Sequence, residues 1–175
     1  PVNTLVQRIL ELAHTRPDTV AVAFKKETLT YARLAERIQT IGTTLRTMGI
    51  KPGDRVLFTA LSKPEMAAVY LGIQYAGAIA VFIDKNTTAE NAAAVYEDAR
   101  AALFLTDKPM KEKSGKDWGG HCTVSSMKQL YAAPTPETYA DYTMPKPEDM
   151  AELLFTTGTT GKPKGVILTY KAVYN

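Results

Sequence analysis

Short runs of mostly apolar residues recur along the first hundred positions, separated by stretches with helical character. The runs are RVLFTA at 55–60, AIAVFI at 78–83 and AALFLT at 101–106, and VAVAF at 20–24 precedes them. Strands that are apolar almost throughout are typical of parallel sheets covered on both faces, and parallel strands need long crossover connections such as helices. The pattern therefore predicts an α/β fold, a mainly parallel sheet with helices on both faces.

The stretches between the runs predict helices and their caps. The clearest helix begins after Thr30 as N-cap and ends near Gly49, and its apolar residues form one stripe: Leu34, Ile38, Ile41, Leu45 and Met48. An earlier helix is indicated by Leu5, Ile9 and Leu12. Capping boxes are predicted for Ser62 with Glu65, in a helix running to Gly77, and for Thr87 with Glu90. These caps explain Glu65 and Glu90, and a strand end explains Asp84, better than acid–base catalysis does.

Composition and charge exclude several classes of protein. With 45% hydrophobic and 22% charged residues the balance is that of a globular domain, and the formal net charge is only +3. The basic run at 108–116 is interrupted by Glu112 and lacks interleaved aromatics, so we expect no nucleic-acid partner. The single cysteine, Cys122, fits a reducing compartment as a small packed side chain, and with His121 it has no second pair for zinc. We see no signal peptide or transmembrane segment and expect a cytoplasmic protein.

Residues 107–121 and 132–149 are rich in Lys, Gly, Pro and Thr and are expected to be loops. Near the end of the chain, TTGTTGKPKG at 156–165 lies between two strand-like stretches, which predicts a hairpin loop. It is not a Walker A loop, because only two residues separate Gly158 from Gly161 and Pro163 follows the lysine. Glycines that turn backbone N–H groups to one point, threonine hydroxyls and lysines suit an anion cradle. A solvated polar turn is the alternative.

ELLFTTGTTGKPKGVILT at 152–169 resembles the phosphate-loop signature of the adenylate-forming (AMP-binding) enzymes. This superfamily includes acyl- and aryl-CoA ligases, adenylation domains of peptide synthetases and firefly luciferase. Three further stretches resemble family motifs in the right order: LTYARLAERI at 29–38, TMGIKPGDRVLF at 47–58 and AAVYLGIQYAGAIAVFID at 67–84. The resemblance implies that residues 1–175 are the first α/β subdomain of the family's large N-terminal domain and end just after the phosphate loop.

The resemblance implies a two-step reaction. A carboxylic acid attacks the α-phosphate of Mg-ATP to give an acyl-adenylate and pyrophosphate, and a thiol, often that of CoA, then takes the acyl group. Family positions that contact the β- and γ-phosphates correspond to Thr156, Thr157, Gly158, Thr159, Thr160, Gly161 and Lys164. Thr156 would also reach Mg²⁺ through its hydroxyl, whereas Lys162 falls at a variable position and is expected to be a solvated flank.

The subclass and the extent of the chain are further expectations. Gly158-Thr159-Thr160 replaces the Gly-Ser-Thr common in peptide-synthetase domains, and Phe82 and Lys85 stand where those domains usually have prolines. Both favour an acyl-CoA ligase, with a place in fatty acid metabolism, over a peptide-synthetase adenylation domain. The family's magnesium carboxylate, adenine contacts, acyl pocket and catalytic lysine all follow the phosphate loop, so we expect the remainder of the N-terminal domain and a C-terminal domain to be missing. The fragment alone would then be inactive, with no catalytic residue of its own. A stand-alone α/β module that binds a nucleotide or a partner is the other hypothesis.

Overall fold

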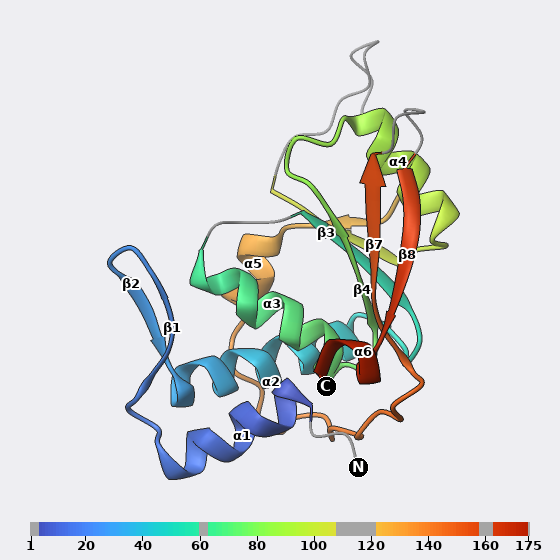
Figure 1. The fold of residues 1–175 in the computed structure, drawn as a ribbon. Helices are drawn as coiled ribbons and strands as arrows, with labels where there is room; N and C mark the ends of the chain where they lie inside the picture. The colour runs from blue at the N-terminus through green and yellow to red at the C-terminus, as the bar shows by residue number, and fades with distance from the viewer. Residues whose placement is uncertain (1–3, 60–62, 108–121, 158–162, 175) are drawn as a thin grey trace.

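The computed structural model describes residues 4–59, 63–107, 122–157 and 163–174, and for 154–157, 163–167 and 173–174 it describes the backbone alone. Figure 1 shows the elements in chain order: α1 (Leu5–Thr15), β1 (Val20–Phe24), β2 (Glu27–Thr30), α2 (Tyr31–Thr47), β3 (Arg55–Thr59), α3 (Pro64–Tyr75), β4 (Ile79–Ile83), α4 (Ala89–Asp98), β5 (Leu103–Leu105), β6 (Val124–Ser125), α5 (Met127–Tyr131), β7 (Met150–Thr157), β8 (Pro163–Thr169) and α6 (Tyr170–Tyr174).

The main sheet has six strands in the order β6-β5-β3-β4-β7-β8. Every neighbouring pair is parallel except β7 and β8, which are antiparallel. The predicted fold class is confirmed. VAVAF does form a strand, β1, but it pairs with β2 in a separate antiparallel sheet. The turn at Lys25 and Lys26 leads the chain straight back, with no crossover helix that could bring β1 into the parallel sheet.

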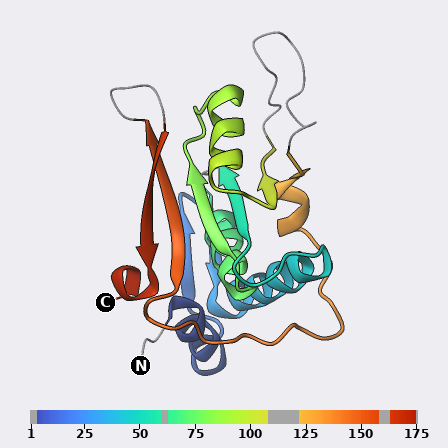
Figure 2. The same ribbon diagram turned by 90° about the vertical axis from the view of Figure 1, so that its right-hand side faces the viewer.

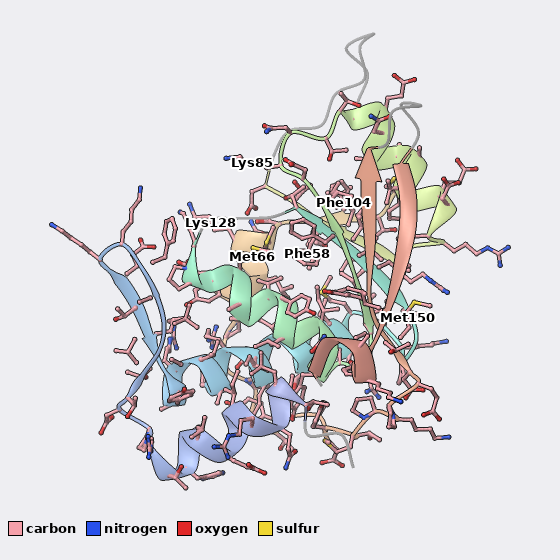
Figure 3. All side chains as sticks on the ribbon, in the orientation of Figure 1. Phe58, Met66, Lys85, Phe104, Lys128 and Met150 are labelled. Atoms are coloured by element: carbon pink, nitrogen blue, oxygen red, sulfur yellow. The ribbon has the colours of Figure 1, made fainter. Side chains whose placement is uncertain are left out.

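Helices cover both faces of the sheet (Figures 1 and 2). One face carries Val56, Phe58 and Ala80, which belong to the core that α1, α2, α3 and α5 complete. The other face carries Leu57 and Val81 in a second core with α4. Side chains alternate between the two cores along β3 and β4, so these strands are apolar on both sides. Figure 3 shows Phe58 on the side of α3.

The apolar stripe predicted for α2 is correct except at its end. Leu34, Ile38, Ile41 and Leu45 are at most 1% exposed, whereas Met48 is 47% exposed. Met48 is the C-cap, and Gly49 follows with a φ of 101°, the left-handed conformation that commonly ends a helix. In α1 the buried residues are Val6 and Ile9, and Leu5 is exposed, so the first predicted stripe was wrong at Leu5.

One of the three predicted N-caps is confirmed. Thr30 accepts a hydrogen bond from the Arg33 amide at 3.2 Å. The cap of α4 is Thr88, which accepts from the Asn91 amide, and not Thr87, whose amide closes a turn onto the Asp84 carbonyl. The N-cap of α3 is Lys63, with no side-chain capping bond and Pro64 in the first turn; Ser62 lies outside the described residues. The predicted capping boxes at Ser62 and Thr87 were therefore wrong.

Residues 132–149 connect α5 to β7 along the amino-terminal edge of the sheet (Figure 2). This connecting segment has no helix or strand, as predicted for a loop, but hydrogen bonds hold it to the helices. Tyr75 donates to the Ala140 carbonyl at 2.5 Å, the Ala140 amide donates to Thr43 Oγ1 at 2.9 Å, and the hydroxyls of Tyr142 and Thr4 are 2.8 Å apart. The short β6 and α5 that precede the segment were not predicted.

Candidate functional site

The carboxyl ends of β3, β4 and β7 lie at one edge of the sheet. From β3 the chain passes through α3 on one face to β4, and from β4 it passes through α4 on the other face to β5, on the far side of β3. In open parallel sheets, ligands bind outside the carboxyl ends of strands where the connections diverge in this way. The edge at β3 and β4, with β7 beside β4, is therefore the candidate binding edge.

The signature segment forms the hairpin of β7 and β8 at this edge. Thr156 pairs with Lys164, Thr157 with Pro163, and Phe155 with Gly165. The predicted hairpin is confirmed, and the backbones of Thr156, Thr157 and Lys164 are brought together. Pro163 begins β8, an edge strand, where a missing N–H is tolerated. The other predicted contacts, Gly158, Thr159, Thr160 and Gly161, and the flank Lys162 lie outside the described residues.

The turn after β4 lies beside the start of this loop. Phe82 pairs with Leu154 in the parallel ladder, and each chain then continues towards the same edge. The turn is closed locally, because Asp84 accepts the Asn86 amide on Oδ1 at 2.8 Å and the Thr87 amide on its carbonyl at 3.0 Å. Asp84 thus has the strand-end role expected of it. Figure 3 shows Lys85 on this turn.

Glu152 anchors β7 to α3 and was missed by the sequence reasoning. Tyr70 donates its hydroxyl hydrogen bond to Glu152 Oε2 at 2.7 Å, and Gln74, 1% exposed, donates to the Tyr70 oxygen at 3.1 Å. These three residues are called the β7 anchor below. The only signal in the sequence is one acidic residue inside the apolar run MAELLF.

The Cys122 thiol and the candidate metal ligands among the described residues provide no further functional group at this edge. Burial raises the pKa of the Cys122 thiol to about 11, so it stays protonated at neutral pH, as expected of a packed side chain. Within the described ranges, no three His, Cys, Asp or Glu side chains lie together as a metal site would require. Among those residues no helix is long and apolar enough to cross a membrane.

A cavity of about 430 Å³ lies away from the hairpin loop. It is lined by residues from the starts of β4 and β7 and from the connecting segment, among them Ile79, Met150 and Asp141. Because β4 and β7 are parallel, their starts lie at the edge opposite to the loop. The cavity is therefore separate from the candidate binding edge.

Known proteins match both the sequence and the fold. The family described as AMP-binding enzyme matches residues 10–175. A 2-succinylbenzoate–CoA ligase of Bacillus cereus (strain Q1) is 29% identical over 96% of this chain and 33% of its own length. Tyrocidine synthase 2 of Brevibacillus parabrevis is 30% identical over 99% of this chain and 5% of its own. The N-terminal subdomain of Klebsiella oxytoca NpsA, in complex with 3-hydroxybenzoyl-AMSN, gives a TM-score of 0.81 at 25% identity, over 96% of this chain and 41% of that one.

The chain belongs to the family of AMP-binding, adenylate-forming enzymes, because the family match covers nearly all of it. It spans about a third of the ligase and a small part of the synthase. A CoA ligase and a peptide synthase match equally well, so similarity alone does not separate the two subclasses predicted from the sequence.

Proposed function

We propose that this chain is the first α/β subdomain of an AMP-forming carboxylate-activating ligase and carries its polyphosphate-binding loop. The observation that carries the proposal is the hairpin register, in which Thr156 and Lys164 are cross-strand partners at the carboxyl edge beside β4. Opposite residues in an antiparallel pair have Cα atoms about 4.5–5.5 Å apart, so a hydroxyl donor and a cation can serve one anion. The assignment of residues 1–175 to one subdomain is part of this proposal.

The loop's role follows from the charge that develops in the first step. A carboxylate oxygen of the acid forms a bond to the α-phosphorus, and the bond from that phosphorus to the bridging oxygen of pyrophosphate breaks. Lys164, the hydroxyls of Thr156, Thr157, Thr159 and Thr160, and the amides of Gly158 and Gly161 would hold the β- and γ-phosphates. Donors preorganised at a developing anion lower the barrier, since they need no reorganisation during the reaction.

Magnesium fits this site only in part. Bound to ATP it would neutralise phosphate charge, and Mg²⁺ in nucleotide sites keeps several waters and takes one or two carboxylates besides phosphate oxygens. Thr156 could supply one neutral oxygen, and no group of three or more His, Cys, Asp or Glu side chains in the described part of the chain could complete a metal site. The family resemblance implies a metal carboxylate that comes after the phosphate loop, and we propose that it belongs to the rest of the complete enzyme.

For the second step we propose CoA as the thiol acceptor. Support comes from Gly158-Thr159-Thr160 and from Phe82 and Lys85, which depart from the peptide-synthetase pattern. The matches to tyrocidine synthase 2 and to NpsA are equally compatible with the alternative, an adenylation domain that loads a carrier protein. An acid-dependent assay with CoA or with phosphopantetheinylated carrier protein as the only thiol distinguishes them. Thioester formation with the carrier protein alone would contradict the CoA assignment.

The test of the loop is Lys164→Ala in the complete protein that contains this chain. We expect exchange of labelled pyrophosphate into ATP, driven by a suitable carboxylic acid, to fall at least tenfold. Removing one positioned donor or charge at a developing anion costs roughly 2–4 kcal/mol of transition-state stabilisation.

Lys171→Ala is the matched control, because Lys171 is an exposed lysine on α6, just after the same hairpin. It should leave the exchange rate unchanged. A Lys164→Ala enzyme as fast as the wild type would show that the loop does not hold the polyphosphate as proposed.

A further inference from the structure

We propose that the β7 anchor fixes the register of β7 in the sheet, so that Glu152 is a positioning residue for the phosphate hairpin. Glu152 is not assigned a contact with any substrate. Its role is to specify which of two neighbouring alignments β7 adopts beside β4. The functional consequence rests on the proposed function, whereas the alignment itself does not.

Strand β7 has little else in its sequence that distinguishes one alignment from the next. Strands buried on one face are aligned by their hydrophobic pattern, because a shift of one residue turns every apolar side chain outwards. Here both faces of the neighbouring β4 are apolar, and Leu153 and Leu154 are adjacent leucines in β7. A slip of one residue would therefore replace leucine with leucine at little hydrophobic cost.

Glu152 makes the two alignments of β7 differ in energy. In the observed alignment Ala80 pairs with Glu152 and Val81 with Leu153. Ala80 belongs to the face covered by α3, where the Tyr70 hydroxyl meets the carboxylate, and Val81 belongs to the face covered by α4. After a one-residue slip the carboxylate would face the second core, beside Leu57 and Val81. A carboxylate moved from a hydroxyl donor to an apolar core is disfavoured.

The neighbouring strand does not impose the alignment by itself. Between β7 and β8 the register shifts at Ala151, where Met150 pairs with Thr169 and Glu152 with Leu168. This bulge fixes the two strands of the hairpin relative to each other. The hairpin as a unit could still slip along β4, and the β7 anchor is a polar contact between the hairpin and α3 that opposes such a slip.

The alignment matters for the loop because β7 runs directly into it. A slip would move Thr156 and Thr157 by one residue spacing along the sheet, about 3.3 Å, and would exchange their faces. Hydrogen-bonding and charge-stabilising groups lose most of their effect at errors of that size. The β7 anchor thus couples the interior of the sheet to the position of the proposed phosphate donors.

The experiment measures the alignment by NMR with labelled methyl groups in the complete protein that contains this chain, without any nucleotide. Glu152→Leu should give a second set of cross-strand contacts, in which Ala80 pairs with residue 151 or 153 instead of residue 152. We expect about 10% or more of the molecules to adopt this second alignment. Glu152→Ala should do the same and covers the case in which the leucine variant fails to fold. Glu152→Gln keeps an oxygen that can accept from Tyr70 and should keep the single native set.

Glu148→Leu is the matched control, since it makes the same change at an exposed acidic residue just before β7. It should show one alignment. Thermal unfolding should show that the second alignment does not result from lost stability. We expect the unfolding midpoint of Glu152→Leu to be no lower than that of the wild type, although the variant populates a second alignment. A single native alignment in both Glu152→Leu and Glu152→Ala, or a second alignment in Glu152→Gln as well, would overturn the proposal. Either result leaves the Lys164 test of the loop unaffected.

Discussion

Arg37 is an almost fully buried cation on α2. Its partners lie on α2, at the end of α5 and at the start of the connecting segment. It is 4% exposed and donates to the carbonyls of Tyr131 and Ala133 at 2.8 and 2.7 Å, and it forms an ion pair with the adjacent Glu36. Glu36 also accepts from Arg33 at 2.8 Å and from the Thr135 hydroxyl at 2.5 Å. These contacts tie the start of the connecting segment to α2.

The same contacts predict how stability depends on pH. The hydrogen bond from Arg37 is the main cause that lowers the pKa of Glu36 to about 2, from 4.5. Because the folded-state pKa is depressed, the contribution of Glu36 is complete above about pH 4.5 and is lost as the pH falls towards 2. Glu36→Gln should lower the free energy of unfolding at pH 7 by about 1–3 kcal/mol.

Urea unfolding between pH 7 and pH 2.5 checks this expectation. The difference between wild type and Glu36→Gln should shrink steadily below about pH 4.5. Glu97→Gln, at an exposed glutamate of α4, is the control and should differ little from wild type throughout. A difference that stays constant down to pH 2.5 would show that the charge of Glu36 is not what stabilises the fold.

At the residue scale the sequence predicted some caps and stripes and missed the polar contacts between distant elements. Thr87 and Thr88 both have a polar residue three positions later, so propensity could not choose between them. The turn at Asp84 decides, because it uses the Thr87 amide and leaves Thr88 to start the helix. Glu152 is hydrogen-bonded to Tyr70, which is 82 positions away in the sequence, and no local pattern could reveal such a contact.

The contact between α2 and α3 is close because each helix offers a glycine to the other. A methyl group at Gly72 would lie 2.5 Å from Ile41 Cγ2, and one at Gly42 would lie 2.5 Å from Tyr75 Cδ1. Both distances are far below van der Waals contact. The two glycines therefore set how near the helices approach.

Gly72→Ala should destabilise the protein, although alanine favours helices over glycine by about 1 kcal/mol. Overpacking of a tight core costs typically about 1–3 kcal/mol, and we expect it to exceed the helix-propensity gain. Thermal or urea unfolding measures the change. In the double variant Gly72→Ala/Ile41→Ala the clashing Cγ2 is gone and only the Cβ of residue 41, at 2.7 Å, remains close, so the alanine at 72 should destabilise less than it does beside Ile41. Equal effects of Gly72→Ala in both backgrounds would contradict the packing account.

Elements were predicted well where a pattern was long and poorly where it was short. The three apolar runs became β3, β4 and β5, and the signature became the β7–β8 hairpin. Strand β6 has two residues and α5 five, too few for periodicity to show. The order of the strands, with β7 beside β4, depends on tertiary packing and could not be derived from spacing alone.

For the molecule as a whole we expect weak nucleotide binding. Residues 1–175 should form no acyl-adenylate and should bind Mg-ATP no more tightly than roughly 1 mM. Phosphate contacts alone exchange water for protein donors at a small net gain, against the entropy of ordering a glycine-rich loop and of association. Isothermal titration with Mg-ATP measures the affinity. A low micromolar dissociation constant would replace the proposed function with the stand-alone nucleotide-binding module.

The pairing of β4 with β7 also has a consequence for biosynthesis. Ala80 and Glu152 lie far apart in sequence, whereas β3, β4 and β5 are made in succession and can pair early. Contacts across long chain separations form slowly, and a nascent protein emerges from its amino terminus. On the ribosome, the edge of β4 would stay open until β7 (Met150–Thr157) emerged, and during that time an unpaired strand edge can pair with other chains. Translation speed over the connecting segment would then influence the yield of folded protein.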